Sequence, residues 1–230
     1  MTRVPAVALF VACLAGCNSS PPADNAAAQP TPIRSVRSGI FVSRENPALR
    51  LQLDPSWRYL GLSSFDLKGI AHVERYHFAV TDGNRITRGL VLQFENILPG
   101  VDEIYRWTVR TPRELGGIPY QYSVFAFNVN DAVREEPEAE MGHTMKFLAE
   151  RGIHLDSEQI VARFARVIGE DKLHEFIIFY SEPLAASGHR LAAVIDTSGS
   201  IKPEFRPLAD SVTSRALRSF SVLTENRSGG

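Results

Sequence analysis

Alternating apolar and polar positions recur along the chain from Ser35 onwards, a period of two residues that is typical of half-buried β-strands. The segments with strand character in the first half of the chain are 39–43, 49–53, 71–80, 86–94, 104–109 and 120–129. Asp82-Gly83 lies between the two longest of these segments and is typical of a tight hairpin turn. We therefore expect neighbouring strands to pair antiparallel.

The second half of the chain predicts further strands at 173–180 and 191–195. The segment 160–168 is ambiguous, because its apolar positions fit a strand and also fit one face of a helix. We favour a strand there, since the strongly apolar 173–180 segment needs a neighbour. The residues 169–172 between the two segments then form a second hairpin turn.

The apolar period changes to a helical one in two places. Acidic residues and a proline favour a helix start at 135, and Gly152 ends this helix, which we expect over 135–151. Apolar residues from Phe205 to Phe220 recur at i, i+3, i+4 and i+7 and predict a helix over 203–221. Strands in long runs with two separate helices predict the α+β class, with a largely antiparallel sheet on which these two helices pack.

Composition divides the chain into four parts. Residues 1–16 place Arg3 before a short apolar run, as a signal peptide does. Residues 17–34 are rich in Pro, Ala and small polar residues without an apolar period, which predicts a disordered tether. Residues 35–225 have the composition of a single globular domain, and 226–230 are expected to be a frayed tail.

The stretch Leu14-Ala15-Gly16-Cys17 resembles the lipobox of bacterial lipoproteins. The apolar run before it is shorter than the roughly 20 residues that span a bilayer as a helix. The resemblance implies that cleavage precedes Cys17, that Cys17 carries a diacylglycerol, and that the membrane is a partner. Asn18 follows, and by resemblance to enterobacterial sorting the absence of aspartate at this position implies the outer membrane, facing the periplasm. An ordinary signal peptide with a chance cysteine is the alternative.

Charge and cysteine content narrow the possible partners. The formal net charge is −1, which gives no indication of a nucleic-acid partner. The two cysteines of the chain are Cys13, within the predicted signal peptide, and Cys17. The folded domain therefore has no thiol for a disulfide or a cysteine metal site.

Sequence patterns of catalytic sites are incomplete in this chain. Gly61-Leu-Ser63 begins like a nucleophile elbow, but Phe65 stands where the second glycine belongs. His174-Glu175 begins a zinc-binding pattern, but Ile178 replaces the second histidine. The domain carries no motif that identifies a family.

Metal ligation is also weakly indicated. His72 and His77 are five residues apart on a predicted strand, so their side chains point to opposite faces. Glu140 and His143 share a helix face, but a carboxylate-bridged metal site needs a second such pair, which we do not find. We expect no metal and no cofactor.

Aromatic residues form the candidate ligand-binding surface: Tyr105, Trp107, Tyr120 and Tyr122 lie in or near predicted strands around a glycine loop. Aromatic side chains with neighbouring arginines are common in binding patches. Packing in the core and at sheet edges is the simpler interpretation of the same residues.

These observations favour a lipid-anchored envelope protein whose non-catalytic domain binds an envelope protein or a small ligand. The alternative is a membrane-tethered, periplasm-facing enzyme of hydrolase type with a histidine or carboxylate base. That alternative requires His154, His174 or His189 to meet carboxylates in a pocket.

Overall fold

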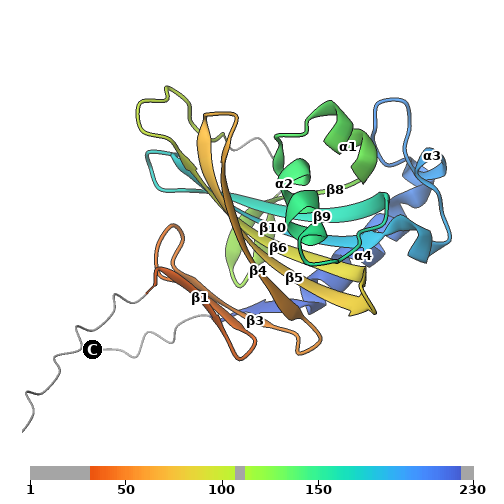
Figure 1. Cartoon of the computed structure of the whole chain (residues 1–230), viewed down its shortest axis with the longest axis horizontal. Coiled ribbons are helices and arrows are strands. Elements are labelled where there is room, and N and C mark those ends of the chain that lie inside the picture. The colour runs from red at the N-terminus through yellow and green to blue at the C-terminus, as the bar shows by residue number, and fades with distance from the viewer. Residues whose placement is uncertain (1–31, 107–111, 224–230) are drawn as a thin grey trace, which may run out of the picture. The chain divides into compact units, whose positions relative to one another are not determined.

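The structure of the protein is a computed structural model that describes residues 32–106 and 112–223. These residues form two antiparallel sheets and several short helices (Figure 1), in agreement with the expected α+β class. The predicted signal peptide, Cys17 with most of the tether, Trp107 and the C-terminal tail lie outside the described residues. In the described part, no helix is long and apolar enough to cross a membrane.

The smaller sheet has four strands in the order β1-β2-β3-β11. The bounds of these strands are Arg34–Arg37 for β1, Ile40–Ser43 for β2, Leu49–Leu53 for β3 and Phe220–Val222 for β11. Phe220 of β11 pairs with Leu53 of β3, so the last described strand joins the sheet that the first three strands form.

The larger sheet has seven strands in the order β4-β5-β6-β10-β9-β8-β7. The strands are β4 (Arg58–Leu67), β5 (Ala71–Asp82), β6 (Arg85–Ile97), β10 (His174–Pro183), β9 (Glu158–Ile168), β8 (Ile118–Asn128) and β7 (Arg113–Leu115). The predicted hairpin at Asp82-Gly83 is confirmed, because Asp82 pairs with Arg85 across a two-residue loop. The ambiguous 160–168 segment is a strand, as favoured.

The helices are short and lie outside the sheets. Their bounds are Val129–Glu135 for α1, Glu140–Ala149 for α2, Leu191–Val194 for α3 and Arg206–Arg218 for α4, with 3₁₀ turns η1 (Leu184–Ser187) and η2 (Pro203–Phe205).

Two apolar layers cover opposite faces of the seven-stranded sheet, because successive strand side chains alternate between faces. Phe78 and Phe94 belong to the larger core cluster, which also contains Phe41 of the small sheet and Val212 of α4. Ala79, one position beyond Phe78, packs instead with Phe147 and Leu148 of α2 in a second cluster. The sheet is therefore a shared middle layer, with α4 and the small sheet on one face and α2 on the other.

The predicted helix over 135–151 is wrong at its start. Asn128 caps α1, because its side chain accepts hydrogen bonds from the backbone N–H groups of Asn130 and Asp131, and this helix already ends at Glu135. Pro137 lies in the turn before α2 rather than in a helix.

The predicted helix over 203–221 is too long at both ends. Its first residues form the 3₁₀ turn η2, and α4 ends at Arg218. Phe220 continues the apolar pattern of the helix, but its backbone pairs with Leu53, and strand pairing determines its conformation.

Two predicted strands are also corrected. Residues 191–194 of the segment 191–195 form the helix α3, whose first N–H group donates to Glu158 Oε2 at 3.1 Å, and Ile195 makes an isolated β-bridge with Ile201. In the predicted strand 104–109, residues 104–106 are irregular and the rest lies outside the described residues. Tyr105 is fixed there by a backbone hydrogen bond to Lys172, not by a strand partner.

Candidate functional site

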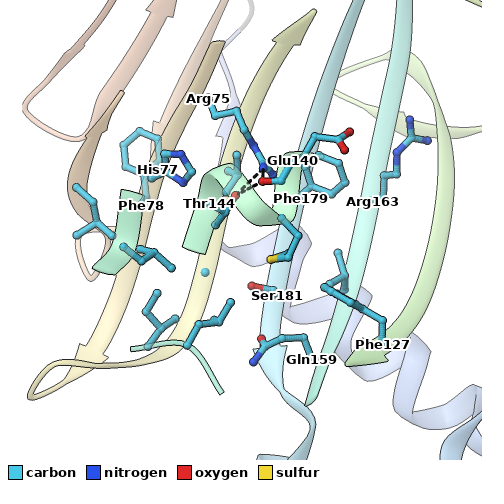
Figure 2. A pocket seen from close by; sticks show the side chains of 18 of the residues that line it. Arg75, His77, Phe78, Phe127, Glu140, Thr144, Gln159, Arg163, Phe179 and Ser181 are labelled. Atoms are coloured by element: carbon cyan, nitrogen blue, oxygen red, sulfur yellow. Dashed lines mark hydrogen bonds between the residues drawn. The ribbon is translucent and has the colours of Figure 1, made fainter. Parts of the chain in front are cut away.

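A cavity of about 350 Å³ lies between α2 and the seven-stranded sheet, and we call it the α2 cavity (Figure 2). Most of its wall is apolar and comes from strands and from α2. The apolar wall residues include Leu60, Phe78, Ile86, Val91, Phe125, Phe127, Met141, Leu148, Leu155, Val161 and Phe179. Its volume lies in the range of roughly 300–1,000 Å³ that is usual for small-molecule sites.

The register between β6 and β10 determines which residues form the floor of the cavity. Val91 on β6 pairs with Phe179 on β10, and Gly89, two residues earlier on β6, pairs with Ser181. A Cβ atom at Gly89 would lie only 2.5 Å from Ser181 Oγ. The missing side chain at Gly89 therefore makes room for the Ser181 hydroxyl on the floor of the cavity, between β6 and β10.

Arg75 of β5 forms the polar end of the α2 cavity. Its side chain is buried, with 4% of its residue surface exposed, and its Nη1 donates to the backbone oxygen of Glu140 and to Thr144 Oγ1, both at 2.6 Å. Burial lowers the pKa of Arg75 to about 10, so the guanidinium stays charged at neutral pH. Arg75 thus ties α2 to the sheet and places a positive charge beside apolar walls (Figure 2).

Two polar atoms on residues of the cavity wall lack a hydrogen-bond partner within the described residues. They are Arg75 Nε, a donor, and Gln159 Oε1, an acceptor, and Gln159 is 1% exposed. Buried polar atoms are almost always hydrogen-bonded, because leaving one unpaired costs free energy. Both residues line a cavity, so a bound molecule could supply the missing partners.

Two buried carboxylates lie next to this polar end. Glu95 and Glu175 face each other across β6 and β10. Tyr105 donates to Glu95 at 2.8 Å, and Arg163 contacts Glu175 at 3.4 Å. Burial raises the pKa of Glu95 and raises that of Glu175 to about 7, although Arg163 opposes the shift at Glu175. The proton occupancy of Glu175 therefore changes near neutral pH.

His77 is a buried member of the wall that is poorly suited to act as a base. Its Nε2 lies 2.8 Å from Ser63 Oγ, and its ring stacks on Phe147 at 4.1 Å between ring centres. Burial, and then the charges of Arg75 and Arg151, lower the pKa of His77 to about 3. Since the protonated form is so unfavourable, His77 is neutral at physiological pH and holds α2 on the sheet by stacking.

Three of the four aromatic residues expected to bind a ligand lie in the described part of the chain, and the structure does not gather these three into one surface. Tyr120 is buried in the larger core and packs edge-on against Phe176, and Tyr122 bonds to Thr213 of α4. Tyr105 lies with Glu95 on the opposite face of the sheet, and Trp107 is outside the described residues. Neither Tyr105, Tyr120 nor Tyr122 lines the α2 cavity.

The histidines required by the hydrolase alternative do not meet in the α2 cavity either. His154 and His189 are exposed, and His174 bonds through Nδ1 to Asn96 at 2.6 Å. His143, the other half of the Glu140 pair, stacks on Phe65 with 3.8 Å between ring centres. Within residues 32–106 and 112–223, no group of three His, Cys, Asp or Glu side chains is placed to hold a metal.

A surface cluster on the β4–β5 pair has the hydrogen-bond order of a serine hydrolase triad. Ser64 Oγ lies 2.9 Å from His72 Nε2, and His72 Nδ1 lies 2.7 Å from Asp66 Oδ1. The side chains of His72 and Asp66 are 44% and 58% exposed, and neither lines the α2 cavity. In catalytic triads the aspartate is buried, so this arrangement lacks the enclosure that orients a base.

Sequence reasoning missed Arg75 and Gln159, the residues that give the α2 cavity its polar character. The available signal was the alternation of side chains along a strand, which places Arg75 on the same face as Val73, His77 and Ala79. A charged residue on an otherwise apolar strand face is unusual, because burying an unpaired charge is costly.

The protein has no match among the known proteins with which it was compared: no family model, no curated protein and no solved structure matches the chain. Functional interpretation therefore depends on the site itself.

Proposed function

We propose that the protein is a lipid-anchored envelope protein whose domain binds a small, largely apolar molecule in the α2 cavity. The observation that carries the proposal is the cavity itself, with apolar walls and two buried polar atoms, Arg75 Nε and Gln159 Oε1, that have no hydrogen-bond partner among the described residues. A site of this kind can bind an apolar molecule by burial and orient it by a few polar contacts.

The anchor part of the proposal is supported by the lipobox at 14–17 and by the Pro- and Ala-rich segment behind it. A diacylglycerol on Cys17, with a further acyl chain on its amine, would give stable attachment, since two or more chains are needed for that. By the same resemblance, we propose the outer membrane, with the domain facing the periplasm. A tethered domain would then work close to a store of apolar molecules.

The binding proposal can be tested with an apolar fluorescent probe, N-phenyl-1-naphthylamine. The full chain carrying Cys17→Ser is suitable, because no covalent lipid is then present to compete. We expect saturable enhancement of the probe fluorescence. Val91→Phe should reduce it about tenfold or more in affinity by filling the cavity, whereas Leu62→Phe, on the exposed part of β4, should not.

Thermal unfolding of both variants separates lost binding from lost folding. If Val91→Phe does not fold, Val161→Phe, at another position on the cavity floor, provides the same test. Absence of saturable binding by the chain with its cavity wall unchanged, or equal binding by the folded Val91→Phe variant, would overturn the proposal.

A hydrolase is the second candidate, and the Ser64–His72–Asp66 cluster is the observation that favours it. In that reaction Ser64 Oγ would attack an ester carbonyl while His72 takes its proton. His72 would then return the proton to the departing alcohol, and water would release the acyl group. A fluorophosphonate probe should then label the chain, and Ser64→Ala should abolish the label. No labelling, or labelling that survives Ser64→Ala, rules this candidate out.

A further inference from the structure

The α2 cavity contains a buried positive charge, that of Arg75, which no carboxylate of the described residues contacts directly. Arg75 takes part in none of the ion pairs formed by the described residues. Its two bonded acceptors, Glu140 O and Thr144 Oγ1, are uncharged atoms. Its Nε is buried and has no acceptor within residues 32–106 and 112–223. A buried cation without a counter-ion is unfavourable, and an anionic group that accepts charge-assisted hydrogen bonds from it offsets part of that cost.

The nearby carboxylates do not serve as this counter-ion. Glu95 accepts from Tyr105 and Gln93, and Glu175 contacts Arg163. Glu140 contacts Arg75 through its backbone oxygen. Among the described residues, the carboxylates of Glu140 and Glu95 favour the charge of Arg75 only from beyond ion-pair distance. Arg163 and Glu140 also line the cavity, and the charge of Arg163 is paired with Glu175.

The remainder of the cavity suits a hydrocarbon chain. Arg75 pairs with Gln93 of β6, and Gln93 pairs with Ile177 of β10. Gln159 pairs with Pro183, at the other end of β10. Six strand residues separate Ile177 from Pro183, or about 20 Å at roughly 3.3 Å per residue. The floor between the two ends includes Phe179, Val91 and Val161. At ~30 Å³ for each water-sized group, the cavity holds on the order of a dozen methylene-sized groups.

We infer that the ligand of the α2 cavity is an anionic amphiphile of medium chain length, a carboxylate whose head group binds Arg75 and whose hydrocarbon chain lies along the floor toward Gln159. This inference rests on the proposed binding function and adds the charge of the head group and its position. The guanidinium of Arg75 would donate to a carboxylate oxygen through Nε, the donor that now lacks an acceptor.

The test compares three probes of equal chain length: dodecanoate, dodecan-1-ol and dodecyltrimethylammonium. Each would displace N-phenyl-1-naphthylamine from the full chain carrying Cys17→Ser, below its micelle concentration. We expect dodecanoate to bind about tenfold more tightly than dodecan-1-ol, and the ammonium probe to bind most weakly. Arg75→Met should remove the preference for dodecanoate, whereas Arg37→Met, an exposed control, should keep it.

The outcomes separate the two claims. If none of the probes and no naphthylamine bind, the proposed function itself fails. If dodecan-1-ol or the ammonium probe binds as tightly as dodecanoate, binding stands but the anionic inference is overturned. Since Arg75 also holds α2, Arg75→Met could fail to fold. In that case the order of affinities of the three probes for the chain carrying only Cys17→Ser tests the inference. Thr144→Val leaves the charge of Arg75 in place and should retain the preference for dodecanoate.

Discussion

Glu95 and Glu175 lie directly opposite each other on β6 and β10, and both side chains are buried. The charged and titratable groups around the pair are Arg163 on β9, Tyr105 in the loop after β6, Glu140 on α2 and Arg75 on β5. Burial is the main cause of the raised pKa values, and the two carboxylates also disfavour each other's charge. Near neutral pH, the domain therefore holds a proton here that the unfolded chain releases.

This arrangement predicts that the domain loses stability as pH rises. The pKa of Glu175 goes from the ordinary carboxyl value of 4.5 in the unfolded chain to about 7 when folded. Its contribution is fully present below pH 4.5 and is lost as pH rises through about 7. Glu175→Gln should raise the free energy of unfolding at pH 8 by up to about 3 kcal/mol, and have little effect near pH 4. Urea unfolding at both pH values measures this, and an equal effect at both would contradict it.

His77 predicts a change in the opposite direction. The folded pKa of about 3 is below the ordinary 6.5, so its contribution to stability is present above pH 6.5 and is lost as pH falls toward 3. His77→Phe keeps a ring against Phe147 and has no proton to gain. We expect this variant to lose less stability than the parent between pH 7 and pH 4, as followed by thermal unfolding. His154→Phe, at an exposed position, is the control.

The short turn between α1 and α2 depends on Gly142. A Cβ atom at this position would lie 1.7 Å from the backbone oxygen of Pro137, a contact that cannot form without a backbone shift. Gly142→Ala should therefore destabilise the domain by about 2 kcal/mol or more, although alanine favours helices in general. Lys146→Ala, on the exposed side of α2, should be nearly neutral. Equal unfolding midpoints in urea for the two variants would refute the turn geometry.

The proposed anchor has its own test. Cys17→Ser removes the thiol that the lipobox resemblance assigns to the diacylglycerol. We expect the variant to leave the membrane fraction, or to accumulate as an uncleaved precursor, and to lose incorporation of an alkyne-labelled fatty acid. Cys13→Ser, within the predicted signal peptide, should preserve both. Unchanged labelling and fractionation of Cys17→Ser would contradict lipidation.

Local patterns predicted much of the strand framework because the signals for strands and tight turns are local. The alternation of β5 and β6 and the Asp82-Gly83 turn give that hairpin directly. Where the structure differs, a distant partner decides: Leu53 pairs with Phe220 and ends α4 early, and Glu158 caps the helix that replaces the strand at 191–195. Such partners are far away in sequence, so periodicity does not reveal them.

The candidate site was harder to predict than the fold, for a related reason. The aromatic residues Tyr105, Tyr120 and Tyr122 are close in sequence, but strand alternation and packing place Tyr105 on the other face from the last two. Arg75 and Gln159 are 84 residues apart in the sequence. They line one cavity because β5 and β9 belong to the same sheet and both side chains lie on its α2 face.

The central claim is that an amphiphilic carboxylate lies in the α2 cavity, and methyl NMR tests it most directly. The full chain carrying Cys17→Ser would be labelled at valine methyl groups and titrated with dodecanoate. We predict nuclear Overhauser contacts between the chain methylenes and the methyl groups of Val91 and Val161, both on the cavity wall. Contacts at saturation that reach only Val101, which lies outside the cavity, would contradict the account, as would the absence of any contact.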